Sequence, residues 1–307
     1  MATQVLNGKA FEWAVANAMS ALTKFEIVED ENSKQAKKCF DEISIKKAEH
    51  FTKSALAAVT HILDKEKNSL VSNDFKIRLL ADSEGKAGDV RDIVVFNTKF
   101  KLGISCKTNH DDLKHSRLSG TSDFVKKWSL DEDGCSELYW EKIRPIFNHL
   151  THVRKSSGRT ALFINFEDKA NKIYWPILDA FSDELLRLQQ KNIMQQNTLC
   201  RNLLSYIVGN NDFYKVISLR NEVVIQGFNF NGTLNFQKSK FPKEIIGVDR
   251  LNGGVYSKTL RFSGGYTINF RIHNASSRVE SSMKFAISAI AFPPKEIYTQ
   301  NISILEI

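Results

Sequence analysis

Apolar residues recur at helical spacing through the first seventy residues of the chain. Residues 8–24 place apolar side chains at Phe11 and Val15 and continue this stripe for two more turns. Such spacing predicts a helix with one buried face. Residues 34–68 carry a second stripe of the same kind. The chain is therefore expected to begin with helices.

The pattern then changes to short apolar runs separated by polar turns. Residues 75–80 predict a strand, and the runs 92–96 and 102–106 predict an antiparallel hairpin that turns near residues 98 and 99. Helical spacing returns between residues 122 and 209, including a segment that Pro145 is expected to bend or interrupt. A further strand is predicted at residues 160–166.

From residue 212 onwards the runs are mostly alternating or β-branched, and Asn-Gly, Gly-Gly and Pro-Pro breaks separate them. The expected fold class is α/β, with a mixed sheet flanked by helices and a β-rich C-terminal lobe. The expected domains are a core with helical elaborations at 1–210 and the β-rich lobe at 211–307.

The hairpin brings an acid and an amine together. In the predicted register, the numbers of opposite residues sum to about 197–199, so Asp92 faces the end of the second strand that carries Ser105 and Lys107. Side chains alternate along a strand, so Ser105 and Lys107 share one face and Cys106 takes the other. An acid that holds a divalent cation beside a lysine suits phosphodiester cleavage. The alternative is a surface hairpin with a solvated ion pair of little energetic consequence.

The hairpin resembles the PD-(D/E)xK nucleases, and a longer series of motifs resembles the HaeIII family of type II restriction endonucleases. The motifs are GDVRDIVV, GISCKTNH, LKHSRLS, GKAFEWA, DFVKKW, YWEKIRPIF, DFYKV, FNFNGTLN and FRIHNAS, between about residues 8 and 292. The resemblance implies a PD-(D/E)xK-like core that cuts double-stranded DNA at the centre of the palindrome GGCC with Mg²⁺.

The resemblance also assigns roles to individual residues. Asp92 takes the position of the first acid, and Lys107 that of the lysine. Ser105 stands where the second acid usually lies, and it cannot act as an anionic ligand. In such folds the helix before the sheet often supplies a glutamate, so Glu12 is a candidate, although it also suits the acidic first turn of a helix. The metal ligands implied are Asp92, Glu12 and the backbone carbonyl of Cys106.

Two donor-rich stretches are candidates for contact with DNA. The polar run after the hairpin leaves the predicted active-site end of the sheet, and its alternative is a solvated loop. The segment that begins at Arg271 suits guanine recognition, since arginine binds O6 and N7 in the major groove, and its alternative is a polar turn. The two histidines of the first stretch lack the further ligands of an HNH nuclease. The candidates are Asn109, His110, Lys114, His115, Arg117, Arg271, His273, Asn274 and Arg278.

Composition narrows the class of protein further. The formal net charge of +8 is what a phosphate-binding surface would leave, although many basic proteins bind no nucleic acid. Four widely spaced cysteines form no CxxC and indicate free thiols. The N-terminus lacks the order of a signal peptide, so a cytoplasmic location is expected. A homodimer would suit a palindromic site.

Three functions are compatible with these observations. The first is a Mg²⁺-dependent, sequence-specific endonuclease. The second is a basic DNA-binding protein without catalysis, in which the hairpin is only structural. The third is a less specific repair nuclease on the same fold.

Overall fold

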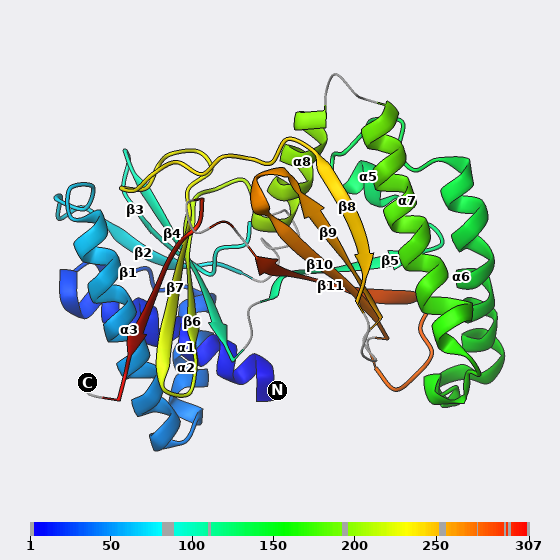
Figure 1. The fold of residues 1–307 in the computed structure, drawn as a ribbon. Helices are drawn as coiled ribbons and strands as arrows, with labels where there is room; N and C mark the ends of the chain where they lie inside the picture. Colours follow the sequence, from blue (N-terminus) through cyan, green and yellow to red (C-terminus); the bar gives the residue numbers. More distant parts are fainter. Residues whose placement is uncertain are drawn as a thin grey trace. The chain divides into compact units, whose positions relative to one another are not determined.

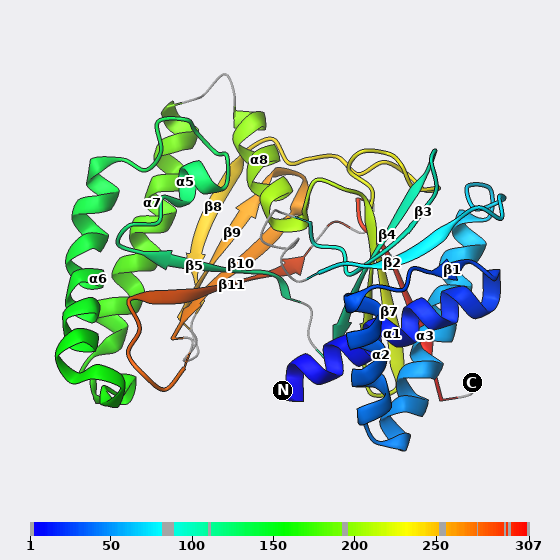
Figure 2. The same cartoon turned by 180° about the vertical axis from the view of Figure 1, so that it is seen from behind.

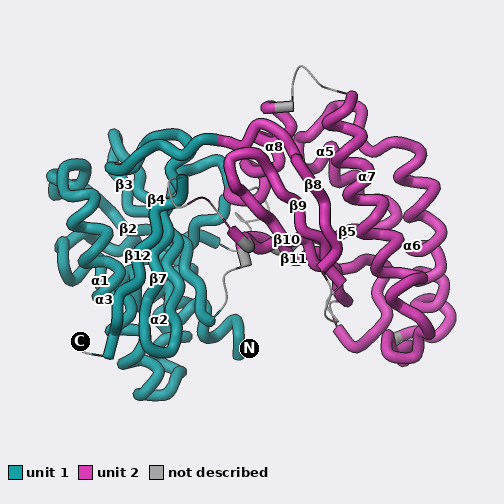
Figure 3. Tube along the Cα trace, in the orientation of Figure 1, with its two compact units in different colours: residues 1–111, 209–240, 294–307 teal, residues 112–208, 241–293 magenta. Residues whose placement is uncertain are grey.

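Figure 1 shows the computed structural model of the chain, which describes residues 3–81, 89–109, 112–191, 196–251, 256–274, 276–291, 293 and 296–305. The chain forms two compact units, coloured separately in Figure 3. Unit 1 contains residues 1–111, 209–240 and 294–307, and unit 2 contains residues 112–208 and 241–293. None of the described helices is long and apolar enough to cross a membrane.

Unit 1 contains a mixed seven-stranded sheet. Its strands β1 and β2 are parallel, as are β4 and β6, and every other neighbouring pair is antiparallel. β6 has six buried residues, which is typical of a strand with neighbours on both sides. In spatial order the strands are β1 (Glu26–Ile27), β2 (Lys76–Leu79), β3 (Ile93–Phe96), β4 (Lys101–Thr108), β6 (Phe213–Ser218), β7 (Glu222–Phe228) and β12 (Tyr298–Ser303).

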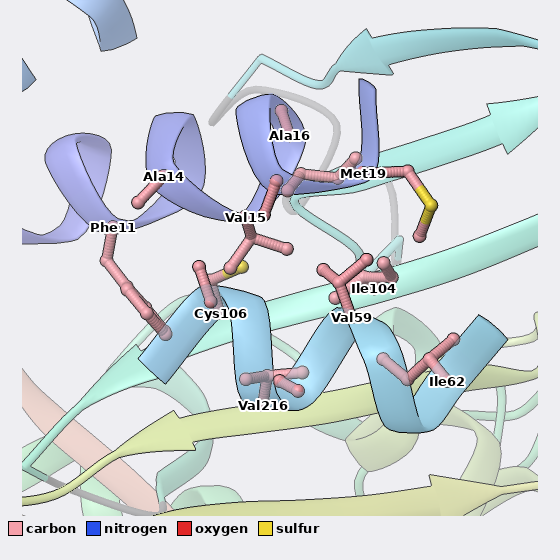
Figure 4. Packing of buried hydrophobic residues seen from close by; sticks show 14 of the residues in the cluster. Phe11, Ala14, Val15, Ala16, Met19, Val59, Ile62, Ile104, Cys106 and Val216 are labelled. Carbon is pink, nitrogen blue, oxygen red and sulfur yellow. The ribbon is translucent and has the colours of Figure 1, made fainter. Parts of the chain in front are cut away.

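Three helices pack on this sheet: α1 (Thr3–Thr23), α2 (Glu31–Glu42) and α3 (Ile45–Glu66). α1 contacts β4 and β2, and α3 contacts β6 and β7. Figure 2 shows the three helices on one face of the sheet, and Figure 4 shows side chains of α1, α3, β4 and β6 meeting in the buried cluster between them. The predicted helix at 34–68 is divided, because the backbone is extended at Ile43.

Unit 2 contains a five-stranded antiparallel sheet with helices packed on one face (Figures 1 and 2). Aromatic rings fill the layer between them, where Phe181 contacts Phe270 and Phe285. The strands in spatial order are β5 (Asp112–Ser119), β11 (Ser282–Ala291), β10 (Thr267–His273), β9 (Ser257–Phe262) and β8 (Ile245–Arg250). The helices are α5 (Phe124–Lys127), α6 (Glu137–Ser157), α7 (Trp175–Lys191) and α8 (Gln196–Val208).

The structure differs from the predicted elements at several places. Residues 112–119 of the expected polar loop form β5, and α6 continues through Pro145. No strand forms at residues 160–166, where short 3₁₀ turns take its place. The boundary expected at residue 210 does not follow the two units, because β6, β7 and β12 complete the first sheet.

Candidate active site

The predicted hairpin is confirmed as β3 and β4, and its register is the expected one. Ile93 pairs with Ile104, and the amide of Asp92 extends the ladder by donating to the Ile104 carbonyl at 2.8 Å. Ile104 and Cys106 point into the helical core (Figure 4). Because side chains alternate along β4, Ser105 and Lys107 lie on the other face of the sheet.

Three donors converge on one oxygen of the Asp92 carboxylate. Oδ2 accepts hydrogen bonds from the Cys106 amide at 2.6 Å, the Ser105 hydroxyl at 3.0 Å and the Lys107 ammonium at 3.5 Å. Oδ1 has no hydrogen bond with any residue of the described ranges. The carboxylate is thus held in place by one oxygen, and the other is left available for a cation or a polar ligand.

Lys107 is a charged group in a low-exposure site. Its side chain and that of Asp92 are each 23% exposed. Burial alone lowers the pKa of Lys107, but the nearby Asp92 and Glu12 carboxylates raise it above its ordinary value. Lys107 is therefore a cation at neutral pH.

Glu12 lies on α1, near the end of β4 that carries Lys107. Its carboxylate is 9% exposed and accepts a hydrogen bond from the Lys9 ammonium at 2.9 Å. Burial, followed by the charges of Asp92 and Glu12, raises the pKa of the Cys106 thiol. Asp92, Glu12, Lys107 and Lys9 thus form a charged group around the end of β4, which we call the β4 charge cluster.

Burying two charges costs free energy unless the charges are well paired and hydrogen-bonded. A buried cluster such as this one is therefore more typical of a functional site than of a stabilising contact. Sequence reasoning did not identify Lys9, although its i, i+3 spacing from Glu12 was a usable signal.

Within the described part of the chain, no three His, Cys, Asp or Glu side chains are grouped closely enough to hold a metal ion.

A second ion pair lies across β4. The Arg91 guanidinium donates to both oxygens of Asp89, at 2.8 and 2.5 Å, and both side chains are largely buried. A Cβ atom at Gly103 would lie 2.1 Å from Arg91 Cδ, so the arginine side chain crosses directly over this glycine. Asp89 is thereby occupied by Arg91, and sequence reasoning had not identified this arginine.

The residues predicted to contact DNA after the hairpin are separated by the structure. Asn109 has a left-handed backbone, with φ of 59°, and its amide donates to the Ser218 carbonyl at 3.0 Å. Lys114 points toward α8, where its ammonium donates to the Tyr206 carbonyl at 2.7 Å and lies 3.8 Å from the centre of the Tyr206 ring. Burial lowers its pKa to about 8. His110 and the side chain of His115 lie outside the described residues.

Arg117 takes the opposite face of β5 from Lys114. Its guanidinium donates to Glu280 at 2.7 Å and to Ser282 at 2.8 Å. Because β5, β11 and β10 are adjacent, Arg117, Lys284 and His273 are paired in one row across the sheet. This row and its same-face neighbours, on the side away from the helices, form what we call the open face of unit 2.

The second predicted DNA-binding stretch begins on this open face. Arg271 is exposed in β10, two residues from His273, so the two share the open face. His273 Nδ1 lies 2.9 Å from the Asn274 carbonyl. The Asn274 amide donates to the Ser276 carbonyl, and Arg278 is exposed beyond the strand. The structure therefore gathers Arg117, Arg271 and His273 and places Arg278 in the following loop.

Comparison of the sequence with known proteins identifies the family to which this chain belongs. The model of the HaeIII restriction endonuclease family matches residues 8–293. The chain belongs to this family.

A curated relative matches over nearly the same extent. The chain is 33% identical over 307 residues to the type II restriction enzyme HaeIII of Haemophilus aegyptius, and the match covers 94% of each chain. No solved structure matches. The chain is accordingly a type II site-specific deoxyribonuclease, an enzyme that hydrolyses phosphodiester bonds.

Proposed function

We propose that this enzyme cleaves double-stranded DNA at the palindrome GGCC, with Mg²⁺ as cofactor and a PD-(D/E)xK-like core. The observation that carries the proposal is the convergence of Ser105, Cys106 and Lys107 on one oxygen of Asp92. Membership in the HaeIII family supports the target sequence.

The β4 charge cluster fits a magnesium ion. Mg²⁺ prefers oxygen ligands and is commonly bound by one or two carboxylates together with water, so it does not need a group of three protein side chains. Oδ1 of Asp92 and the Glu12 carboxylate would hold it. The Cys106 carbonyl would be a third ligand, since the N–H and C=O of a strand residue point to the same side and its N–H donates to Asp92. Bound there, the ion would polarise the phosphate and activate water.

Lys107 acts in this proposal as a fixed positive charge. Without a bound metal the Asp92 and Glu12 carboxylates raise its pKa, which favours the protonated form at neutral pH. Its ammonium would orient the attacking water and stabilise the charge that develops on the phosphate. Ser105 does not replace a second acid. Its hydroxyl instead keeps the Asp92 carboxylate in one orientation.

DNA contacts are proposed for both predicted stretches. The open-face residues Arg117, Arg271 and His273, with the loop residues Asn274 and Arg278, would contact the duplex in unit 2. Asn109 would contact it at the end of the hairpin, and contacts are proposed also for His110 and for His115 of β5, on the family resemblance alone. Lys114 is the weakest of these candidates, because its ammonium is already bound to Tyr206.

Incubation of a plasmid with the purified enzyme and Mg²⁺ tests the proposal. Discrete fragments that end within GGCC are expected, and omission of the divalent ion should abolish them. Asp92→Ala and Lys107→Ala should each eliminate cutting while most of the DNA affinity remains. Near-normal cutting by either variant would contradict the assignment of the site.

The same plasmid assay separates the alternatives. A smear or a pattern that depends on DNA structure would indicate a less specific nuclease. An intact plasmid that is still bound would indicate a protein without catalysis.

A further inference from the structure

The open face of unit 2 contains two cations that no described residue neutralises. Lys284 lies on β11 and Arg271 on β10, and neither has a hydrogen bond or an ion pair with another residue of the described ranges. By contrast, Arg117 and Arg261 on the same face are paired with Glu280 at 2.7 Å and Asp249 at 2.7 Å. Among these four cations of the open face, only Lys284 and Arg271 thus lack a carboxylate partner within the described ranges.

The strand register makes these two cations neighbours. Lys284 is opposite His273, and Arg271 is opposite Ala286, so the two charged side chains are diagonal neighbours on one face with small Ala286 beside them. Diagonal neighbours in a sheet are roughly 7–8 Å apart, which is within reach of long side chains, so an anion between the two cations would contact both and offset their repulsion.

Polar groups surround this pair. Ser257 is directly opposite Arg271, and Asn269 is opposite Thr259. The Ser257 and Thr259 hydroxyls and the Asn269 Oδ1 are buried and have no hydrogen-bond partner among the described residues. These atoms provide hydrogen-bonding groups on the same face as the Lys284–Arg271 pair.

We infer that the Lys284–Arg271 pair is a DNA-contact site that binds acceptor oxygens or nitrogens of the duplex. This inference rests on the proposed cleavage of DNA and extends it to Lys284, which no sequence motif had singled out. The acceptors have two sources, the phosphates of the backbone and the O6 and N7 atoms of guanine. The two sources predict different binding behaviour.

Binding of Lys284→Gln, Arg271→Gln and the double variant tests the inference. Two duplexes of equal length and composition are used, one with GGCC and one with these bases shuffled, with Ca²⁺ in place of Mg²⁺ to prevent turnover. The matched control is Lys172→Gln, which removes one exposed positive charge elsewhere in unit 2. Melting curves of all variants verify folding.

Either of two results supports the site. Phosphate contact predicts weaker binding of both duplexes and a salt dependence that decreases by about 0.9 per lost contact in a plot of log affinity against log salt. Guanine contact predicts a loss of roughly 5- to 150-fold for the GGCC duplex alone. In the phosphate case Arg271→Lys restores binding, whereas guanine contact requires the arginine fork and is not restored.

Wild-type affinity of the folded single and double variants for both duplexes would overturn the inference. Failure of the wild-type enzyme itself to prefer GGCC would instead contradict the proposed function, so the two failures are distinguishable.

Discussion

At the scale of residues, Asp92 is the centre of the proposed active site. One carboxylate oxygen accepts three hydrogen bonds from consecutive residues of β4, and the other has no hydrogen bond within the described ranges. A carboxylate held in this way would lose little further conformational freedom on binding a cation, which would favour the proposed catalytic role. The neighbouring Lys107 is proposed to contribute charge without taking part in proton transfer.

The charge of Lys107 leads to a prediction about how the cleavage rate depends on pH. Its pKa lies above the ordinary lysine value, so its charge is fully present at pH 7 and is lost only as the pH rises through that elevated value. The rate of the cutting step should show no loss due to Lys107 between pH 7 and about 9.5. Lys107→Met should reduce the rate by at least about 10²-fold at every pH in this range.

Single-turnover cleavage of a short GGCC duplex measures this rate. Lys107→Arg, which keeps the charge, should retain more activity than Lys107→Met. A wild-type rate that titrates near pH 8 and loses this dependence in Lys107→Arg would contradict the role of a fixed charge.

The sequence predicted the Asp92–Lys107 pair because alternation and hairpin register are local properties of the chain. It did not predict Arg91, whose position depends on the space above Gly103 of the neighbouring strand. Lys114 and Arg117 were grouped as one polar run. Once the run is known to be a strand, their odd separation places them on opposite faces.

At the scale of elements, β4 of unit 1 is constrained on both edges and on one face. It pairs with β3 on one side and with β6 on the other, and α1 packs on it. Its two faces differ, since Ile104 and Cys106 belong to the core and Ser105 and Lys107 to the proposed active site. Changes in its shape should therefore affect stability and catalysis together.

Gly103 tests this constraint. A methyl group at this position would overlap Arg91 Cδ and lie 3.1 Å from the Asp212 carbonyl, so Gly103→Ala must displace the Arg91–Asp89 pair. We expect a loss of about 1–3 kcal/mol in the free energy of unfolding. The control is Gly8→Ala in α1, where no atom lies within 4 Å and a gain of roughly 0.5–1 kcal/mol is expected.

Urea unfolding curves of the two variants provide the comparison. The same chemical change should thus have opposite signs in the two elements. A Gly103→Ala enzyme as stable as the wild type would show that Arg91 moves aside without cost.

Glu66 at the end of α3 predicts a pH effect on stability. Its Oε1 accepts hydrogen bonds from the Tyr214 hydroxyl at 2.7 Å and from the Asn235 amide at 3.0 Å, while burial raises its pKa. The folded state then binds more protons than the unfolded state between the ordinary and the raised pKa, so stability should fall as the pH rises through this window.

The difference in Tm between Glu66→Gln and the wild type isolates this contribution. The Tm of the variant relative to the wild type should rise from pH 4 upward and become constant above the raised pKa. An exposed glutamate of α2, changed in Glu42→Gln, serves as the control. A constant difference across the range would contradict the assigned shift.

Sequence reasoning was most successful for elements whose pattern is long and regular. It predicted α1, β3, β4 and five strands of the C-terminal third, because their apolar spacing follows one face, but it did not predict β8 or β12. It failed at residues 160–166, where an apolar run forms 3₁₀ turns and only one isolated bridge, from Leu162 to Arg278. It could not assign strands to sheets, since that pairing joins residues far apart in the chain.

For the whole molecule, the proposed palindromic target raises the question of oligomeric state. A twofold homodimer would match the symmetry of GGCC, and each subunit would then cut one strand. We expect two protein chains per duplex at saturation. Analytical ultracentrifugation of the enzyme with a GGCC duplex and Ca²⁺ measures this ratio, and a single chain per duplex at saturation would contradict the dimer.

The interleaved path of the chain has a consequence for synthesis of the enzyme in the cell. The chain passes between the two units four times, because unit 1 is made of three segments and unit 2 of two. A ribosome that has translated both Asp92 and Lys107 has not yet produced β6, the strand that borders β4, and β12 is translated later still. A nascent chain therefore carries the proposed catalytic residues before the strands that complete their sheet have been made.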